Sequence, residues 1–340
     1  MTEEGEVQPT SYPLLSADDP AAILEALVSL KVCLPEETIT GVTKAGEGNM
    51  NLVLRVTTDQ RSVIVKQARP WVEKYRGIPA PDERILSEIK FYRCISKAAD
   101  LQAAMPSVIA SEASQRLLVL EDLGASSDYA TLYSSKVPAN EVDSVFEQAI
   151  DWVARLHQCD VVGEEGIGCK PLLSLNHEYI FSVPLSDPPA TDLDLECDGL
   201  AKASKDLRLD DSVRQAMERL GKVYLAGGGP LLHGDYYPGS WLKTESGFRV
   251  IDPEFCFCGP SEFELGVVAA HWIFCGSAAN GSTIDRVCQR YSKQVSRELI
   301  EGFTGAELIR RVIGVAKPPL DADLERRVEW LQCGAQFLKQ

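Results

Sequence analysis

The sequence predicts an α+β protein of two lobes, a small antiparallel-sheet lobe followed by a larger and mainly helical lobe. Its 340 residues are enough for two hydrophobic cores. From about residue 35 to residue 122, apolar and polar residues alternate as in strands with one buried face, and after Gly124 the apolar residues recur at helical spacing. We therefore expect an N-lobe at residues 1–122 and a C-lobe at residues 123–340.

The elements of the N-lobe follow from local patterns. A helix is expected in DPAAILEALVSLKV, where Asp18 or Asp19 precedes Pro20 as a start signal. Strands are expected in ITGVTKAGEGNMNLVLRVTT, around a glycine turn, and in RSVIVKQA. A proline-rich stretch, residues 69–82, leads to an amphipathic helix, ERILSEIKFYRCISKAA, and then to two strands in PSVIASEASQRLLVLEDLG. The N-lobe is thus an antiparallel sheet with one inserted helix.

The C-lobe begins with a long helix, NEVDSVFEQAIDWVARLHQ, which has an apolar stripe. Residues 160–210 are rich in Pro, Asp and Ser, and their pattern assigns no element. A second helix, DDSVRQAMERLGKVYL, is ended by AGGGP. Two short strands are expected in PLLHGD and GFRVIDPEF, and the remainder is mostly helical.

The composition excludes some partners. A formal net charge of −16 argues against a nucleic-acid or anionic-membrane binder, whose surface would be basic. An anionic small molecule stays compatible, since a few placed cations and a metal can reverse the local charge. No apolar run is long enough for a membrane span, and the acidic start MTEEGEVQPTSYPLL resembles neither a secretory signal nor a transit peptide. We expect a cytoplasmic protein.

The first candidate site element is AGEGNMN, residues 45–51, between two expected strands. Glycines there let backbone N–H groups approach a polyphosphate closely, because no Cβ stands in the way. An ordinary hairpin turn is the alternative, since Gly and Asn favour such turns.

The second element is Lys66, which shares a strand face with Ile64. Its side chain can extend to solvent, or a carboxylate can hold it so that it points at phosphates. Glu88 in the following helix is the natural partner, with Glu83 as an alternative.

The third element is His233-Gly234-Asp235, followed 17 residues after Asp235 by Asp252 in IDPEF. Phosphoryl transfer needs one carboxylate to accept the proton of the acceptor hydroxyl and another at a strand end to hold Mg²⁺. Asp235 and Asp252 supply these in order, and Glu254 adds a second hard oxygen ligand. We expect His233 to brace the loop through hydrogen bonds rather than to titrate in the reaction.

In this order the motifs resemble the aminoglycoside-phosphotransferase and choline-kinase class of small-molecule kinases, which share the two-lobed protein-kinase-like fold. The resemblance is most specific to the methylthioribose kinase family. That family has a Gly-Asp-Gly-Asn-hydrophobic-Asn loop, an Ile-Val-Lys-Gln-Ala strand, a Met-Glu-Asp-Leu hinge, a His-Gly-Asp loop ending in Gly-Ser, then Ile-Asp-Pro-Glu-Phe and Glu-Met-Ile-Arg-Arg. Across residues 45–315, this chain reads GEGNMN, IVKQA, LEDL, HGDYYPGS, IDPEF and ELIRRVIG.

The resemblance implies ATP and Mg²⁺ as cofactors, a small sugar-like substrate and a homodimer. It makes Asp235 the catalytic base in contact with the substrate. The residues that it implies for the metal are Asp252, Glu254 and Ser240, and those for the nucleotide are Gly46, Gly48, Asn49, Lys66, Glu88 and the hinge backbone from Glu121 to Leu123. It places Arg310 and Arg311 near the sugar and the transferred phosphoryl group, whereas an isolated Arg pair would more often lie on a basic helix surface.

Some positions depart from these patterns. Ser240 stands where the wider class has a metal-binding Asn, although Ser matches the methylthioribose kinase family. Tyr236, Tyr237 and Pro238 replace that family's Leu-His-Thr, and Glu264 stands where Asp is usual. Residues 160–210 match no family pattern, and such segments supply most substrate contacts, so the departures concern the acceptor more than the reaction.

The expected activity is therefore ATP-dependent phosphorylation of 5-methylthioribose at its anomeric oxygen, giving 5-methylthioribose 1-phosphate in methionine salvage. One alternative keeps the chemistry and changes the acceptor to an aminoglycoside, choline or homoserine, although an Arg pair would repel the cations among them. Another is a non-catalytic nucleotide-binding protein, which the presence of Lys66, Asp235 and Asp252 disfavours. A protein kinase is disfavoured because Asp-Phe-Gly, Ala-Pro-Glu and His-Arg-Asp motifs are missing.

Overall fold

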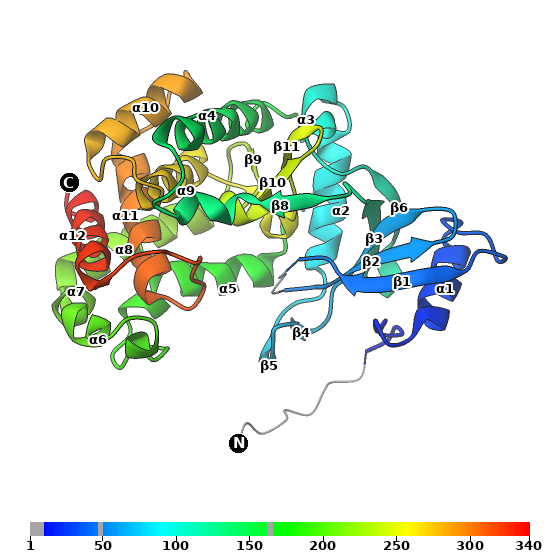
Figure 1. Cartoon of the computed structure of the whole chain (residues 1–340). Coiled ribbons are helices and arrows are strands. Elements are labelled where there is room, and N and C mark those ends of the chain that lie inside the picture. Colours follow the sequence, from blue (N-terminus) through cyan, green and yellow to red (C-terminus); the bar gives the residue numbers. More distant parts are fainter. Residues whose placement is uncertain (1–9, 47–49, 162–165) are drawn as a thin grey trace.

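The computed structural model of the chain describes residues 10–46, 50–161 and 166–340. The chain forms two lobes that lie side by side, as predicted (Figure 1). The smaller lobe contains the blue strands, and the larger lobe contains the green, yellow, orange and red helices.

A five-stranded antiparallel sheet forms the smaller lobe, with the strand order β1-β2-β3-β7-β6. Its strands are β1 (Ile39–Lys44), β2 (Leu52–Thr58), β3 (Ser62–Gln67), β6 (Val108–Glu112) and β7 (Leu117–Glu121). The register pairs Lys66 with Val53 on one side and with Leu118 on the other. Directly paired residues share a sheet face, so these three side chains lie on the same face.

Helices cover both faces of this sheet. Helix α1 (Pro20–Ser29) begins after Asp19, whose carboxylate accepts a hydrogen bond of 3.0 Å from the Ala22 N–H, and it packs against the face opposite to Lys66. Helix α2 (Arg84–Ile95) lies on the Lys66 face, between the sheet and the larger lobe (Figure 1). Helix α2 ends four residues before the expected helix does, and a separate short helix, α3 (Ala99–Ala103), follows. The proline-rich stretch forms a hairpin of β4 (Trp71–Val72) and β5 (Tyr75–Pro79).

The larger lobe is mainly helical. Its long helices are α4 (Ala139–Leu156), α5 (Lys170–Phe181), α8 (Asp211–Ala226), α9 (Ser261–Phe274), α10 (Gly281–Tyr291), α11 (Arg297–Ile313) and α12 (Leu324–Leu338). The segment that the sequence left unassigned contributes α5 and the short helices α6 (Leu200–Ala203) and α7 (Lys205–Leu209). None of the helices in the described ranges is long and apolar enough to cross a membrane.

Helix α11 lies at the centre of this lobe, where every residue from Ile300 to Ile313 is buried. Its approach to α9 is close because Gly266 has no side chain: a Cβ there would lie 2.6 Å from the Phe303 Cβ. This close packing brings the inner faces of α9 and α11 into direct contact, and both helices carry polar residues there.

Two small sheets carry the loops with the predicted site. Strand β9 (Leu231–Leu232) pairs with β12 (Phe257–Cys258). Strand β10 (Trp241–Thr244) pairs with both β11 (Gly247–Val250) and β8 (Ser126–Asp128). The prediction of two strands in this region was therefore incomplete. The His-Gly-Asp loop follows β9, and Asp252 follows β11.

Candidate active site

The His-Gly-Asp loop is held against the loop that carries Asp252. Gly234 has φ +87°, and a Cβ there would lie 2.1 Å from the Phe255 carbonyl oxygen, so the close approach requires glycine. The His233 Nε2–H donates to the Ile251 carbonyl at 2.9 Å, and its Nδ1 faces the Asp235 N–H at 3.4 Å. Burial lowers the pKa of His233, which keeps the ring neutral. His233 is thus a brace between the two loops.

Glu264 supports the same loop from α9. Its Oε1 accepts hydrogen bonds from the backbone N–H groups of His233 (2.8 Å) and Gly234 (3.0 Å), while Oε2 lies 2.8 Å from the His157 Nε2. Sequence comparison marked Glu264 as a departure from the family pattern but gave it no role. Glu264 is 30 positions from Gly234 and 107 positions from His157 in the sequence, so a local sequence pattern could not reveal these contacts.

Lys66 lies between two carboxylates. Its Nζ is 2.7 Å from the Glu88 Oε2 and 2.8 Å from the Asp252 Oδ1. Glu88, and not Glu83, is therefore the helix partner. Burial alone would lower the pKa of Lys66, but Asp252, Glu88 and Glu254 outweigh it and raise this pKa well above its ordinary value. The ammonium group is charged and joins the smaller lobe to the larger one.

Asp252 and Glu254 differ in their surroundings. Asp252 has a left-handed backbone (φ 63°, ψ 53°), and its side chain is 40% exposed. Glu254 is buried, and its Oε2 accepts from the Asn51 Nδ2 at 2.8 Å and lies 3.4 Å from the Arg84 Nε. Asn51 and Arg84 were not predicted to carry roles of their own. They anchor Glu254 from the smaller lobe.

Arg310 and Arg311 do not form a basic helix surface. Both are buried at the end of α11 and face Asp235. The Arg311 Nη2 lies 3.1 Å from the Asp235 Oδ1, and the Arg310 Nη2 lies 3.9 Å from the same oxygen. The structure thus brings Asp235 and the Arg pair together, although they are more than 70 residues apart in the sequence.

The two tyrosines that depart from the family loop have different surroundings. Tyr236 is buried, stacks on Trp152 with ring centroids 5.2 Å apart and donates its hydroxyl to the Ala149 carbonyl. Tyr237 is partly exposed, and the Arg311 guanidinium lies 4.5 Å from its ring centroid. Ser240 donates its hydroxyl to the Asp235 carbonyl at 2.7 Å and so closes the loop. Tyr237 is therefore the loop tyrosine that lies beside Asp235 and the Arg pair.

Four of the predicted nucleotide residues lie at two places: Lys66 and Glu88 contact each other on the Lys66 face of the sheet, and Glu121 and Leu123 lie at the connection between the lobes. Glu121 ends β7, and Leu123 follows in the hinge. Gly46 follows β1 with φ +78°, a conformation that suits a glycine turn. Gly48 and Asn49 lie outside the described residues.

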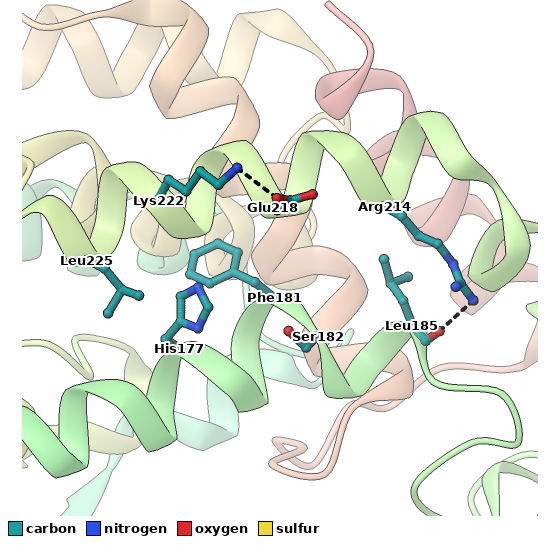
Figure 2. Close-up of a pocket in the computed structure, with 8 residues that line it drawn as sticks. All are labelled: His177, Phe181, Ser182, Leu185, Arg214, Glu218, Lys222 and Leu225. Carbon is teal, nitrogen blue, oxygen red and sulfur yellow. Dashed lines mark hydrogen bonds and ion pairs between the residues drawn. The ribbon is translucent and has the colours of Figure 1, made fainter.

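Two pockets lie outside the cluster around Asp235. One of about 220 Å³ is lined by hinge residues, including Glu121 and Leu123, together with Arg249. The other, of about 380 Å³, lies between α5 and α8 and contains no predicted site residue (Figure 2). Figure 2 shows His177 and Phe181 of α5 pointing toward α8, where an ion pair of 2.7 Å joins Lys222 to Glu218.

The carboxylates do not form a complete metal cage by themselves. Within residues 10–46, 50–161 and 166–340, no three His, Cys, Asp or Glu side chains gather as a metal-binding group. A Mg²⁺ ion that is held mainly by substrate phosphates needs only one or two carboxylates. The half-exposed Asp252 suits that arrangement.

The known proteins that this chain resembles in sequence or in structure include several kinases. The methylthioribose kinase of Exiguobacterium sibiricum is 26% identical, over 87% of this chain and 87% of that protein. That of Bacillus velezensis is 23% identical, over 96% and 93%. Among solved structures, the choline kinase LicA from Streptococcus pneumoniae has a TM-score of 0.52 at 14% identity, covering 93% of this chain and 99% of that one, and it shows that the fold is kinase-like. LicA in complex with AMP has a TM-score of 0.54, again at 14% identity.

The sequence match to a known family covers most of the chain. It extends over residues 41–299, from β1 through the His-Gly-Asp loop and Asp252 to the start of α11, and ends before the Arg pair. Since these residues match the phosphotransferase enzyme family, the chain belongs to that family and is a phosphotransferase.

Proposed function

We propose that this protein is an ATP-dependent kinase that phosphorylates 5-methylthioribose at its anomeric hydroxyl, giving 5-methylthioribose 1-phosphate. The observation that carries the proposal is the position of Asp235, whose Oδ1 lies 3.1 Å from Arg311 and 3.9 Å from Arg310. A carboxylate that is held by two guanidinium groups suits the transfer of an anionic group to a neutral hydroxyl. Relatives that are named methylthioribose kinase, matched over most of their length, support this acceptor.

In the proposed reaction, Asp235 orients the acceptor hydroxyl and accepts its proton as the oxygen attacks the γ-phosphoryl group. Arg310 and Arg311 neutralise the charge on the transferred group, and Lys66 positions the phosphates of the nucleotide. His233 and Glu264 keep the Asp235 loop in place through the hydrogen bonds described above. The nucleotide base would lie against the hinge from Glu121 to Leu123.

The residues present fit a magnesium ion. Asp252 offers a partly exposed carboxylate beside Lys66, and phosphate oxygens would complete the coordination. One oxygen of Glu254 is already engaged by Asn51 and Arg84, so coordination by Glu254 would use its other oxygen. The hydroxyl proton of Ser240 is used within the loop, so Ser240 would serve the metal through an oxygen lone pair. The bound ion would neutralise phosphate charge and help to align the nucleotide.

The geometry favours a neutral acceptor over a cationic one. An aminoglycoside or choline would bring positive charge to a site where two buried guanidinium groups already face Asp235. The opposing carboxylates of Asp235 and Glu307 balance that pair but leave little negative charge to attract a further cation. The second candidate function, phosphorylation of another neutral or zwitterionic alcohol such as homoserine, keeps the same catalytic residues.

The acceptor can be identified by an ADP-release assay with Mg²⁺ and ATP over methylthioribose, choline, homoserine and aminoglycosides. We expect turnover on methylthioribose. Turnover on another acceptor with none on methylthioribose would refute the substrate assignment, and ATP binding without turnover on any of them would favour a non-catalytic protein.

The role of Asp235 is tested in the same assay. Asp235→Asn keeps the size of the side chain but cannot accept the proton, so we expect turnover to fall by about 10²–10⁴-fold while ATP still binds. Glu245→Gln, which changes an exposed carboxylate in the turn between β10 and β11, is the matched control and should retain full activity. Full activity of Asp235→Asn would contradict its role as the base.

A further inference from the structure

Arg310 and Arg311 are directed to one point by a residue one helical turn before them. Successive residues of a helix point about 100° apart, yet both guanidinium groups face the same Asp235 oxygen. Glu307 accounts for this, because residues three and four positions apart lie on one helix face. Its Oε1 accepts from the Arg311 Nε at 2.6 Å, and its Oε2 lies 3.2 Å from the Arg310 Nη1.

Glu307 is held in turn by α9. The His271 Nε2 lies 3.1 Å from the Glu307 Oε1, and the His271 Nδ1 lies 2.6 Å from the hydroxyl of Tyr133, at the end of the short helix η2 (Tyr129–Tyr133). Tyr133, His271 and Glu307 are all buried. A continuous chain of contacts therefore runs from Tyr133 through His271, Glu307 and Arg311 to Asp235.

The proton positions along this chain follow from the charges. Burial raises the pKa of Tyr133 well above its ordinary value, so its hydroxyl stays protonated and donates to Nδ1. Burial, together with the nearby Arg311 and Arg310, lowers the pKa of His271 to about 4, although the contact with the Glu307 carboxylate acts in the opposite direction. The ring is thus neutral, and its one N–H lies on Nε2, directed at Glu307.

We propose that His271 is a positioning residue, which holds Glu307 in the rotamer that directs Arg310 and Arg311 at Asp235 and at the transferred group. This inference rests on the proposed function of Asp235 as the catalytic base. When Asp235 turns to the acceptor hydroxyl, the Arg pair loses one of its two carboxylate partners. Glu307 then keeps both guanidinium groups in place, and His271 keeps Glu307 in place.

Two substitutions separate the two hydrogen bonds of His271. Gln at position 271 can place an amide N–H near the Nε2 position and so still donate to Glu307. Asn is shorter; its amide can accept from Tyr133 but cannot reach Glu307. With the acceptor that the wild-type protein phosphorylates, we expect His271→Asn to lower kcat by about 100-fold, since misplacing a catalytic group by about 1 Å has an effect of that size. His271→Gln should lose less than about 10-fold.

The KM for ATP separates positioning from a general loss of structure, because the chain of contacts does not include Lys66 or the hinge. We expect this KM to be unchanged in both variants. Trp272→Phe is the matched control, since Trp272 is the next residue of α9. The substitution removes a partly buried hydrogen bond of 3.0 Å to Asp143 and should lower stability without changing kcat.

Each result either supports or overturns the positioning role of His271. Equal losses of kcat in the Asn and Gln variants, or a shared rise in the KM for ATP, would overturn the positioning role. If neither variant folds, Tyr133→Phe replaces them: a fall in kcat of threefold or more at constant KM for ATP supports the chain of contacts, and wild-type kinetics overturn it. A wild-type protein that phosphorylates none of the acceptors would overturn the proposed function itself, before any variant is compared.

Discussion

Buried charged side chains near Asp235 and Asp252 are paired with side chains of opposite charge. Lys66 is buried between Glu88 and Asp252, and Glu254 is buried against Arg84. Removing one member of a buried ion pair leaves an uncompensated charge, whereas replacing both members by apolar residues is often neutral for stability. This difference allows the structural role of Lys66 and its proposed role in phosphate binding to be measured separately.

We predict that Lys66→Met lowers the free energy of unfolding by about 3–5 kcal/mol, because Glu88 is fully buried and loses its cation. The double variant Lys66→Met with Glu88→Leu should recover most of that stability, as Asp252 remains partly hydrated. Neither variant should turn over substrate, since both lack the ammonium group that we propose binds the nucleotide phosphates. Urea unfolding and the ADP-release assay provide the two measurements. An active double variant would contradict the proposed phosphate-binding role of Lys66.

The neutral state of His271 predicts a specific pH dependence of stability. Its pKa is about 4 in the folded protein but about 6.5 in an unfolded chain. The unfolded state therefore takes up a proton first as the pH falls, and the folded protein loses about 2 kcal/mol between pH 7.5 and pH 5 through this residue. The groups that face the ring are Tyr133, Tyr237, Glu307, Arg310 and Arg311.

The measurement is the free energy of unfolding at pH 7.5 and pH 5 for the wild-type protein and for His271→Gln. The variant should lose about 2 kcal/mol less over this range. His233 is also buried with a lowered pKa, but it is present in both proteins and cancels in the comparison. Parallel profiles would show that His271 does not carry this dependence.

At the scale of elements, strand β2 is tied to the hinge. Arg55 pairs in register with Ile64 and so lies on the Lys66 face of the sheet. Its Nε and Nη2 donate to the two oxygens of Asp122 at 2.9 and 3.0 Å, and Nη2 also donates to the Gly124 carbonyl at 3.0 Å. This paired contact fixes the hinge relative to the sheet, where we propose that the nucleotide base lies.

We predict that Arg55→Lys raises the KM for ATP about fivefold, corresponding to about 1 kcal/mol, because lysine keeps the charge but not the paired hydrogen bonds. The KM for the acceptor should not change. Arg61→Lys is the control, since Arg61 forms an ion pair of 3.0 Å with Glu37 and has a similar exposure. Equal changes in both variants would mean that the effect is not specific to the hinge.

Elements with a clear period were predictable from the sequence, and elements that depend on distant partners were not. The side chains of strand β3 alternate between the face that packs against α1 and the Lys66 face, as the sequence pattern indicated. Strands β8 and β10 have three and four residues and form through mutual pairing, so neither carries a sufficient pattern. Asp235, Lys66 and Asp252 follow recognisable motifs. The supporting roles of Glu264, His271 and Arg84 arise from contacts between remote segments, which spacing alone cannot give.

At the scale of the whole molecule, one hydrophobic core extends across the expected lobe boundary at residue 122. Ile85, Ile89 and Phe91 of α2, with Leu118 and Leu120 of β7, belong to the same buried cluster as the helices of the larger lobe. The Phe91 ring lies 6.1 Å from that of His233, and the Cys256 thiol contacts the Ser87 carbonyl. Helix α2 therefore packs against both lobes.

We predict that the protein unfolds in one cooperative transition, because the smaller lobe cannot separate without exposing this shared core and the buried Lys66–Asp252 and Asn51–Glu254 contacts.

Of the five tryptophans, Trp71 alone precedes the boundary at residue 122. A variant that keeps Trp71 and carries Phe at the other four positions reports on the smaller lobe, and Trp71→Phe reports on the larger one. Each variant is compared with its own far-UV circular dichroism, so that any change in stability from the substitutions cancels. The urea midpoints from fluorescence and dichroism should coincide within each variant. A fluorescence midpoint for Trp71 well below the dichroism midpoint would show that the smaller lobe unfolds independently at residue 122.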